Sequence, residues 1–230
     1  MAKRRKDELE EPLVDLGDVS QQARGFFEEN QRLIVGVVAG IALFFVGYFA
    51  YLNFYKAPRA EEAMGQMHKA EFAFQQDSFA KALNDPGGDF PGFIDIASEY
   101  GGTKAGNLAH YYAGVSFLRL GNYEKAIKYL NRYSAKESFT KAMKKGMLGD
   151  AYSELQKYDK AVSNYKSAAS ASGDNMTAPY YLKKAGMLLE MQGKYSAALT
   201  QYKKIRDDFY SSPQGQAGGI EKYIARVEGK

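Results

Sequence analysis

Three blocks of similar sequence follow one another in the C-terminal half of the chain, at residues 113–130, 148–165 and 185–202. Each block has a Gly, an apolar or aromatic residue three positions later, a Tyr nine positions after the Gly, an Ala three positions after the Tyr, and a bulky residue four positions further on. These anchors are Gly114, Gly149 and Gly186; Phe117, Tyr152 and Leu189; Tyr123, Tyr158 and Tyr195; Ala126, Ala161 and Ala198; and Leu130, Tyr165 and Tyr202. Successive Gly anchors are 35 and 37 residues apart. Self-similarity with a period of roughly 20 to 50 residues is typical of a repeat solenoid.

The anchors resemble those of the tetratricopeptide repeat, which places Gly and Ala where its two helices approach closely and wedges bulky side chains between repeats. The resemblance implies that each block is an antiparallel pair of helices. The short polar linkers agree with this, and they are Gly121-Asn122, Gln156-Lys157 and Gly193-Lys194. We therefore predict repeats at residues 107–140, 142–175 and 179–212, followed by a capping helix at residues 217–228.

A degenerate repeat is predicted ahead of these three, at residues 60–102. It carries Ala70, Ala73, Phe79 and Ala82 at the same offsets as the repeat anchors. The Pro- and Gly-rich segment at residues 85–92 is expected to split its second helix.

An uncharged apolar segment runs from Leu33 to Tyr55, between Arg32 and Lys56. As a helix of 23 residues it would be about 35 Å long, enough to cross a hydrocarbon core of roughly 30 Å. A cleaved signal peptide is the alternative, but its apolar region is usually about 7 to 15 residues long. We predict an all-α chain with a single N-terminal transmembrane helix (33–55), an N-terminal tail (1–32) and a tetratricopeptide-repeat solenoid as the C-terminal domain (56–230).

Basic residues favour a cytoplasmic N-terminus, since they are more frequent before the apolar segment than just after it. Those before it are Lys3, Arg4, Arg5, Lys6, Arg24 and Arg32, and those within about 15 residues after it are Lys56, Arg59 and Lys69. Three glycines, Gly36, Gly40 and Gly47, share one face of the predicted span and would let another helix approach closely. The alternative is that they reflect only the frequency of glycine in membrane helices.

The composition argues against an enzyme. The chain has no Cys and two His, which excludes thiolate chemistry and the known multi-His or Cys/His metal sites. No phosphate loop or nucleophile motif is present, so we predict no catalytic, cofactor-binding or metal-ligating residue and no small-molecule substrate. The net charge is only +4, and the Lys residues are scattered and match no nucleic-acid module, so we expect no nucleic-acid partner. His68 and His110 are expected to be structural or solvent-facing.

The first helix of each tetratricopeptide repeat lines a groove, and the repeat register assigns residues to it. They are Leu108, Tyr111, Val115, Leu118 and Arg119; Met143, Asp150, Ser153 and Glu154; and Tyr180, Lys183, Met187, Glu190 and Met191. Met and Tyr suit an apolar partner segment, either extended or helical. An acidic C-terminal tail does not fit, because modules that clamp such tails resemble one another in using Lys and Asn where this chain has Tyr111 and Val115. The alternative is that the capping helix or a neighbouring repeat covers these side chains.

The uncharged anchor, the split first repeat and the segment EYGGTKAGNLAHYYAG at residues 99–114 are together similar to the YfgM-like family of ancillary SecYEG translocon subunits, in a Bacteroidetes-type version. The resemblance implies a single-pass bacterial inner-membrane protein with a periplasmic repeat domain. Its partners would be Sec translocon subunits and a membrane-anchored periplasmic chaperone of the PpiD type. Two alternatives stay open: a structural or cell-division envelope protein unrelated to export, and a cytosol-facing receptor if the orientation is reversed.

Overall fold

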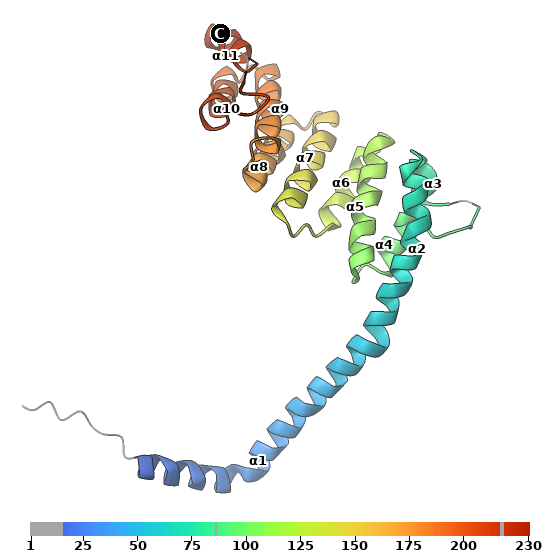
Figure 1. Cartoon of the computed structure of the whole chain (residues 1–230), viewed down its shortest axis with the longest axis vertical. Coiled ribbons are helices and arrows are strands. Elements are labelled where there is room, and N and C mark those ends of the chain that lie inside the picture. Colours follow the sequence, from blue (N-terminus) through green and yellow to red (C-terminus); the bar gives the residue numbers. More distant parts are fainter. Residues whose placement is uncertain (1–15, 86, 217–218) are drawn as a thin grey trace, which may run out of the picture. The chain divides into compact units, whose positions relative to one another are not determined.

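The computed structural model describes residues 16–85, 87–216 and 219–230, with side chains from Phe26 onward. Every regular element in these ranges is helical (Figure 1), so the predicted all-α fold class is confirmed. The described residues do not include residues 1–15 of the predicted N-terminal tail, with four of its basic residues, nor Pro86 in the predicted breaker, nor the first two residues of the predicted capping helix. The chain divides into two units, with the boundary between Ala57 and Pro58.

The first unit is helical throughout its described part, with α1 (Leu16–Ala50) followed directly by the π-helix η1 (Tyr51–Lys56). The predicted apolar span lies within these two elements, and its most apolar stretch buries no side chain. A water-soluble unit would bury such a surface, whereas a bilayer provides an apolar surrounding for it. The helix is long and apolar enough to cross a membrane by length and composition. The one amide in the span is satisfied, because Asn53 Nδ2 donates to the Phe49 carbonyl at 2.9 Å.

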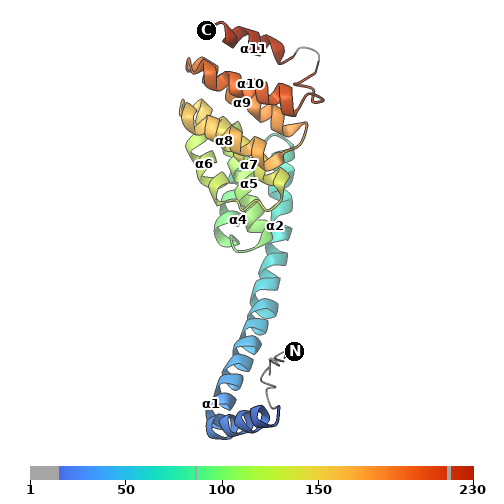
Figure 2. The same cartoon turned by 90° about the vertical axis from the view of Figure 1, so that its left-hand side faces the viewer.

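The second unit is a series of helix pairs. The helices are α2 (Ala57–Gln75), α3 (Phe79–Leu83), α4 (Phe93–Glu99), α5 (Lys104–Arg119), α6 (Tyr123–Arg132), α7 (Ser138–Glu154), α8 (Tyr158–Ser172), α9 (Thr177–Met191), α10 (Tyr195–Asp208) and α11 (Glu221–Glu228). From α4 to α11, each helix packs against the next along the chain (Figure 2). Because contacts are made mainly between neighbours, each pair buries its apolar face against the pair before and after it.

One turn geometry recurs between the two helices of all four pairs. The residue with positive φ is Asp77, Gly121, Gln156 or Gly193, always seven positions after the Gly anchor or its counterpart Ala70. The next residue donates its N–H to the carbonyl five positions earlier, as in Asn122 to Phe117 at 2.9 Å and Ser78 to Ala73 at 3.0 Å. This is the Schellman motif, which satisfies carbonyls at the helix end. The α2–α3 connection therefore has the same turn as the three clear repeats.

The Gly anchors lie where the second helix of each pair presses a bulky side chain onto the first. An added Cβ would lie 2.7 Å from Leu130 at Gly114, 2.5 Å from the Tyr165 ring at Gly149 and 2.4 Å from the Tyr202 ring at Gly186. All three bulky residues are buried. The sequence pattern of Gly followed by a bulky residue sixteen positions later is thus a packing contact between two helices.

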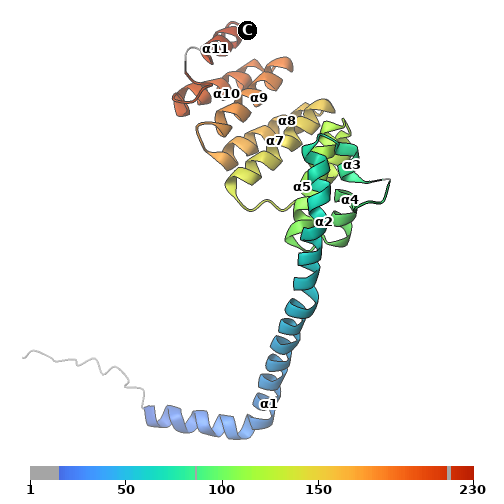
Figure 3. The same cartoon turned by 45° about the vertical axis from the view of Figure 1, so that its right-hand side comes forward.

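Helices α2, α4 and α5 lie side by side (Figure 3), and aromatic rings join them. Phe74 on α2 meets the Tyr112 ring of α5 edge-on at 5.0 Å, and Phe93 on α4 stacks on Tyr112 at 4.9 Å. The loop between α3 and α4 returns close to α3, because an added Cβ at Gly92 would lie 2.2 Å from the Leu83 carbonyl oxygen. Thr103 caps α5, since its Oγ1 accepts the Gly106 N–H at 3.0 Å.

Candidate partner-binding groove

The residues that the repeat register assigns to the groove lie on α5, α7 and α9, the first helices of their pairs, and none of them is buried. The exposed ones are Tyr180, Met187 and Met191 on α9, together with Arg119 and Glu154 at the ends of α5 and α7. The arrangement leaves a set of accessible side chains on the first helices of the repeats. We call this set the groove.

Six of the predicted residues line one open hollow between α5 and α7: Val115, Leu118, Arg119, Asp150, Ser153 and Glu154. The remaining lining residues were not assigned to the groove from the sequence, and these are Tyr123, Met147, Tyr165 and Lys184. We call this space the α5–α7 hollow; its lining combines the apolar Val115, Leu118 and Met147 with charged and hydroxyl groups.

Two of the polar lining residues, the buried Tyr165 and the carboxylate Asp150, form a hydrogen-bonded cluster. The Tyr165 hydroxyl donates to Asp150 Oδ1 at 2.6 Å, and Lys184 of the next repeat forms an ion pair with the same oxygen. The Lys184 ammonium also lies over the rings of Tyr165 and Tyr180, at 5.0 and 5.4 Å from their centroids. Asp150 is therefore held by groups from two repeats, and its charge is compensated within the chain.

Protonation in this cluster follows from its burial and its partners. Burial, then the hydrogen bond to Asp150, raises the pKa of Tyr165, and burial raises the pKa of Tyr181 to about 12. Both phenols are therefore hydrogen-bond donors at neutral pH. Burial would lower the pKa of Lys184, but the hydrogen bond and charge of Asp150 outweigh it and leave that pKa raised. Lys184 is thus a fixed cation.

A second open hollow lies between α9 and α11, and Met187, Glu190 and Met191 of the predicted set line it together with Tyr195, Arg226 and Lys230. We call it the α9–α11 hollow. Its carboxylate repeats the pattern of Asp150: Glu190 Oε2 accepts the Tyr202 hydroxyl at 3.0 Å and the Arg226 Nη2 at 2.7 Å. In both places a carboxylate on a first helix pairs with a cation two helices further along the chain, from α7 to α9 and from α9 to α11.

The other predicted groove residues lie outside these two hollows. Tyr111 is half-buried between the rings of Tyr112 and Tyr133, at 5.5 and 5.3 Å. Lys183 lies over the Tyr223 ring at 4.7 Å. The remaining ones are Leu108 and Met143, both half-buried, and Tyr180, which is exposed.

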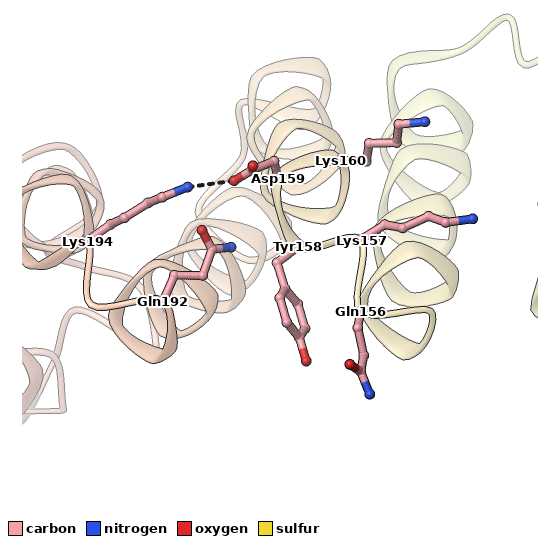
Figure 4. A pocket seen from close by; sticks show the side chains of 7 residues that line it. All are labelled: Gln156, Lys157, Tyr158, Asp159, Lys160, Gln192 and Lys194. Carbon is pink, nitrogen blue, oxygen red and sulfur yellow. Dashed lines mark hydrogen bonds and ion pairs between the residues drawn. The ribbon is translucent and has the colours of Figure 1, made fainter.

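A third hollow lies at the turn edge of the second and third clear repeats (Figure 4). Its lining is mostly polar and comes from Gln156, Lys157, Tyr158, Asp159, Lys160, Gln192 and Lys194. Lys194 and Asp159 form an ion pair at 2.6 Å across it. An ion pair between two exposed side chains contributes little to stability. None of the residues that line this hollow was assigned to the groove from the sequence.

The histidines and the span glycines were also singled out from the sequence. His110 is buried on α5 beside Tyr129, and burial lowers its pKa, whereas His68 is exposed on α2. No group of His, Asp and Glu among the described residues is placed to hold a metal ion. Gly36, Gly40 and Gly47 have open space where a Cβ would stand.

Comparison with known proteins agrees with the repeat architecture. Models of the tetratricopeptide repeat match residues 108–138 and residues 147–215. No curated protein matches the chain. An all-helical tetratricopeptide-repeat fold is typical of a non-enzymatic interaction scaffold, and no catalytic family is indicated. The chain therefore carries tetratricopeptide repeats behind an N-terminal helix that is able to span a membrane.

Proposed function

We propose that this protein is a non-enzymatic scaffold, anchored by one membrane helix, whose groove binds a segment of another protein. One observation carries the proposal: six side chains assigned to the groove from the repeat register line an open hollow, in which Val115, Leu118 and Met147 supply apolar surface. Such a hollow offers apolar surface to a partner, and the charged side chains of its lining orient that partner.

The finer proposal is that the scaffold is an accessory subunit of the Sec translocon, linking it to a periplasmic chaperone or to emerging clients. Its support is the resemblance of the anchor, the split repeat and residues 99–114 to the YfgM-like family. In this proposal Gly36, Gly40 and Gly47 face a partner helix in the inner membrane, and the repeat domain lies in the periplasm. A structural or cell-division role is the second candidate, because the same repeats serve both.

Site-directed photo-crosslinking tests both levels of the proposal. A photoreactive amino acid is placed in the full chain at Val115 in the groove, at Gly40 in the span, or at Lys166 on α8, which is exposed and outside the groove. We expect discrete protein adducts from Val115 and Gly40 that are absent from Lys166, with translocon subunits among the Gly40 adducts. Identical adducts from all three positions, or none from Val115, would refute the scaffold. Envelope-assembly proteins in place of channel subunits would favour the second candidate, and Gly40 adducts with lipid alone would refute the helix contact.

Protease treatment of intact spheroplasts tests the orientation. Residues beyond Lys56 are expected to be degraded, because the excess of basic residues before the span favours a cytoplasmic N-terminus. Protection of the repeat domain until the membrane is opened would indicate the reversed orientation, and a cytosol-facing receptor would replace the proposed role.

A further inference from the structure

The first helix of the last repeat, α9, has an apolar face that the described part of the chain does not cover. Met176, Tyr180, Met187 and Met191 are 73%, 47%, 46% and 58% exposed. With Lys184 they are spaced four, four, three and four residues apart, which puts them on one side of a helix. We call these five residues the α9 stripe. It covers sixteen residues, from Met176 directly before α9 to Met191, and as a helix is about 24 Å long, or about four turns.

The cation in the middle of the stripe is already compensated. Lys184 is paired with Asp150, and its ammonium lies over the Tyr165 and Tyr180 rings. The stripe therefore presents methionine and aromatic surface along its whole length and no free charge at its centre. Methionine adapts its shape to a partner more readily than branched side chains do.

The charges around the stripe are unequal. Together with Lys183, the side chains that line the α5–α7 and α9–α11 hollows include five cations and three anions. Asp150 and Glu190 are held in ion pairs with Lys184 and Arg226. Within the described residues, the cations Arg119, Lys183 and Lys230 and the anion Glu154 form no ion pair. An occupant of the stripe therefore meets an excess of positive charge beside an apolar seam.

We propose that the α9 stripe binds an amphipathic helix of another protein, with an apolar face of about four turns and acidic residues along its flank. This rests on the proposed scaffold function and names the class of segment that the groove takes. The spacing of the stripe is the one that packs against a second helix, and Lys183 and Arg119 select for carboxylates on that helix.

A second copy of this chain is a poor occupant. The centre of the stripe falls between Lys183 and Lys184, so two stripes packed antiparallel would place Lys183 of each copy opposite Lys184 of the other. Parallel packing would also place each cation beside its copy. Like charges directly opposed across an interface disfavour association.

Designed peptides test the proposal on the full chain in phosphatidylcholine nanodiscs. Three fluorescein-labelled peptides of about 18 residues are compared. Two are helices with Leu residues along one face, flanked by Glu in one and by Lys in the other. The third has the composition of the Glu peptide in shuffled order, so that its Leu residues do not share a face. We expect fluorescence anisotropy, corrected for empty nanodiscs, to show the Glu peptide binding at least about tenfold more tightly than the other two. Equal binding of the Glu and Lys peptides overturns the charge selection, and equal binding of the shuffled peptide overturns the helical seam.

Paired variants locate the site. Met187→Glu combined with Met191→Glu changes the net charge by the same amount as Lys166→Glu on α8, yet only the first variant alters the stripe. We expect the first to lose binding of the Glu peptide by at least about tenfold and the second to retain it. Circular dichroism melting confirms that both are folded, and if the methionine variant unfolds, Lys183→Glu serves instead and is expected to reverse the preference between the Glu and Lys peptides.

Two further outcomes overturn the inference. The first is peptide binding that survives the stripe variants and is lost with Val115→Glu and Leu118→Glu. The second is a stable dimer of the full chain that excludes the peptide and that dissociates in the Met187→Glu, Met191→Glu variant. The photo-crosslinking at Val115 is independent of the stripe, so the scaffold function can stand where this inference fails.

Discussion

Each glycine anchor is a contact between a helix backbone and a buried side chain of the partner helix. At Gly186 an added Cβ would lie 2.4 Å from the Tyr202 ring, which is fully buried. Ala favours a helix over Gly by about 1 kcal/mol, but overpacking a core costs about 1–3 kcal/mol. We expect overpacking to dominate, so that Gly186→Ala lowers the free energy of unfolding by about 1 kcal/mol, measured by urea denaturation.

The matched control for that substitution is Gly65→Ala on α2. No atom lies within 4 Å of a Cβ placed there, so only the helix preference acts. The free energy of unfolding should rise by up to about 1 kcal/mol. If both substitutions stabilised the protein, close packing would not be the reason for glycine at the anchors.

The recurring turn carries a strained residue in one of the three clear repeats. Gln156 has a φ of 55° where the neighbouring repeats have Gly121 and Gly193. A side chain in this left-handed region costs about 1–2 kcal/mol, part of which is offset because glycine also loses more entropy on folding. We expect Gln156→Gly to raise the free energy of unfolding by about 0.5–1 kcal/mol and Gly193→Gln to lower it. A loss of stability in Gln156→Gly would show that the Gln side chain makes a contact worth more than the strain.

The last helix, α11, is fixed to α9 by an ion pair whose effect depends on pH. The hydrogen bond from Arg226, and then that from Tyr202, lowers the pKa of Glu190 from its ordinary 4.5, although burial opposes this. A carboxylate with a lowered folded pKa stabilises the fold above its ordinary pKa, and this stabilisation is lost as the pH falls through the folded value. In urea denaturation from about pH 6 to about pH 3, Glu190→Gln should therefore be less stable at pH 6 and lose less stability on acidification than the unmodified chain. The exposed Glu61→Gln, which removes the same charge on α2, should keep the original pH dependence; a Glu190→Gln profile parallel to the unmodified one would contradict the role of this pair.

Much of the fold could be predicted from the sequence because the repeat anchors are local. Gly, Tyr and Ala at fixed offsets mark both helices of a pair, and a Gly-containing linker marks a turn. The turn at Asp77 was harder to find, because it uses a residue that rarely adopts positive φ. Tyr165 and Lys184 were missed in the groove for a different reason. Tyr165 was assigned to the core as a repeat anchor, but its hydroxyl also reaches the lining of the α5–α7 hollow. The ion pair of Lys184 with Asp150 depends on how one repeat packs on the next.

At the scale of the whole molecule, the two units differ in where they put apolar surface. The first exposes it along the span from Leu33 to Tyr55, and the second buries it in cores that include Phe93, Tyr165 and Tyr202. Exposed apolar surface of this extent is satisfied by lipid. We expect the full chain to stay in the membrane fraction after alkaline carbonate extraction and to dissolve only in detergent, and a chain that begins at Pro58 to be released as a water-soluble helical protein.

Charge placed in the span separates membrane insertion from other causes of sedimentation. Arg near the centre of a membrane helix costs about 2.5–3.5 kcal/mol, so Ile41→Arg combined with Phe45→Arg should move a large share of the full chain into the carbonate supernatant. The matched control is Phe26→Arg with Phe27→Arg, which adds the same charge before the span and should leave extraction unchanged. Because the second unit begins at Pro58, its circular dichroism melting should be the same in all of these chains. Release of the unmodified chain by carbonate would mean that the apolar helix lies against protein, and the repeats would then belong to a peripheral scaffold.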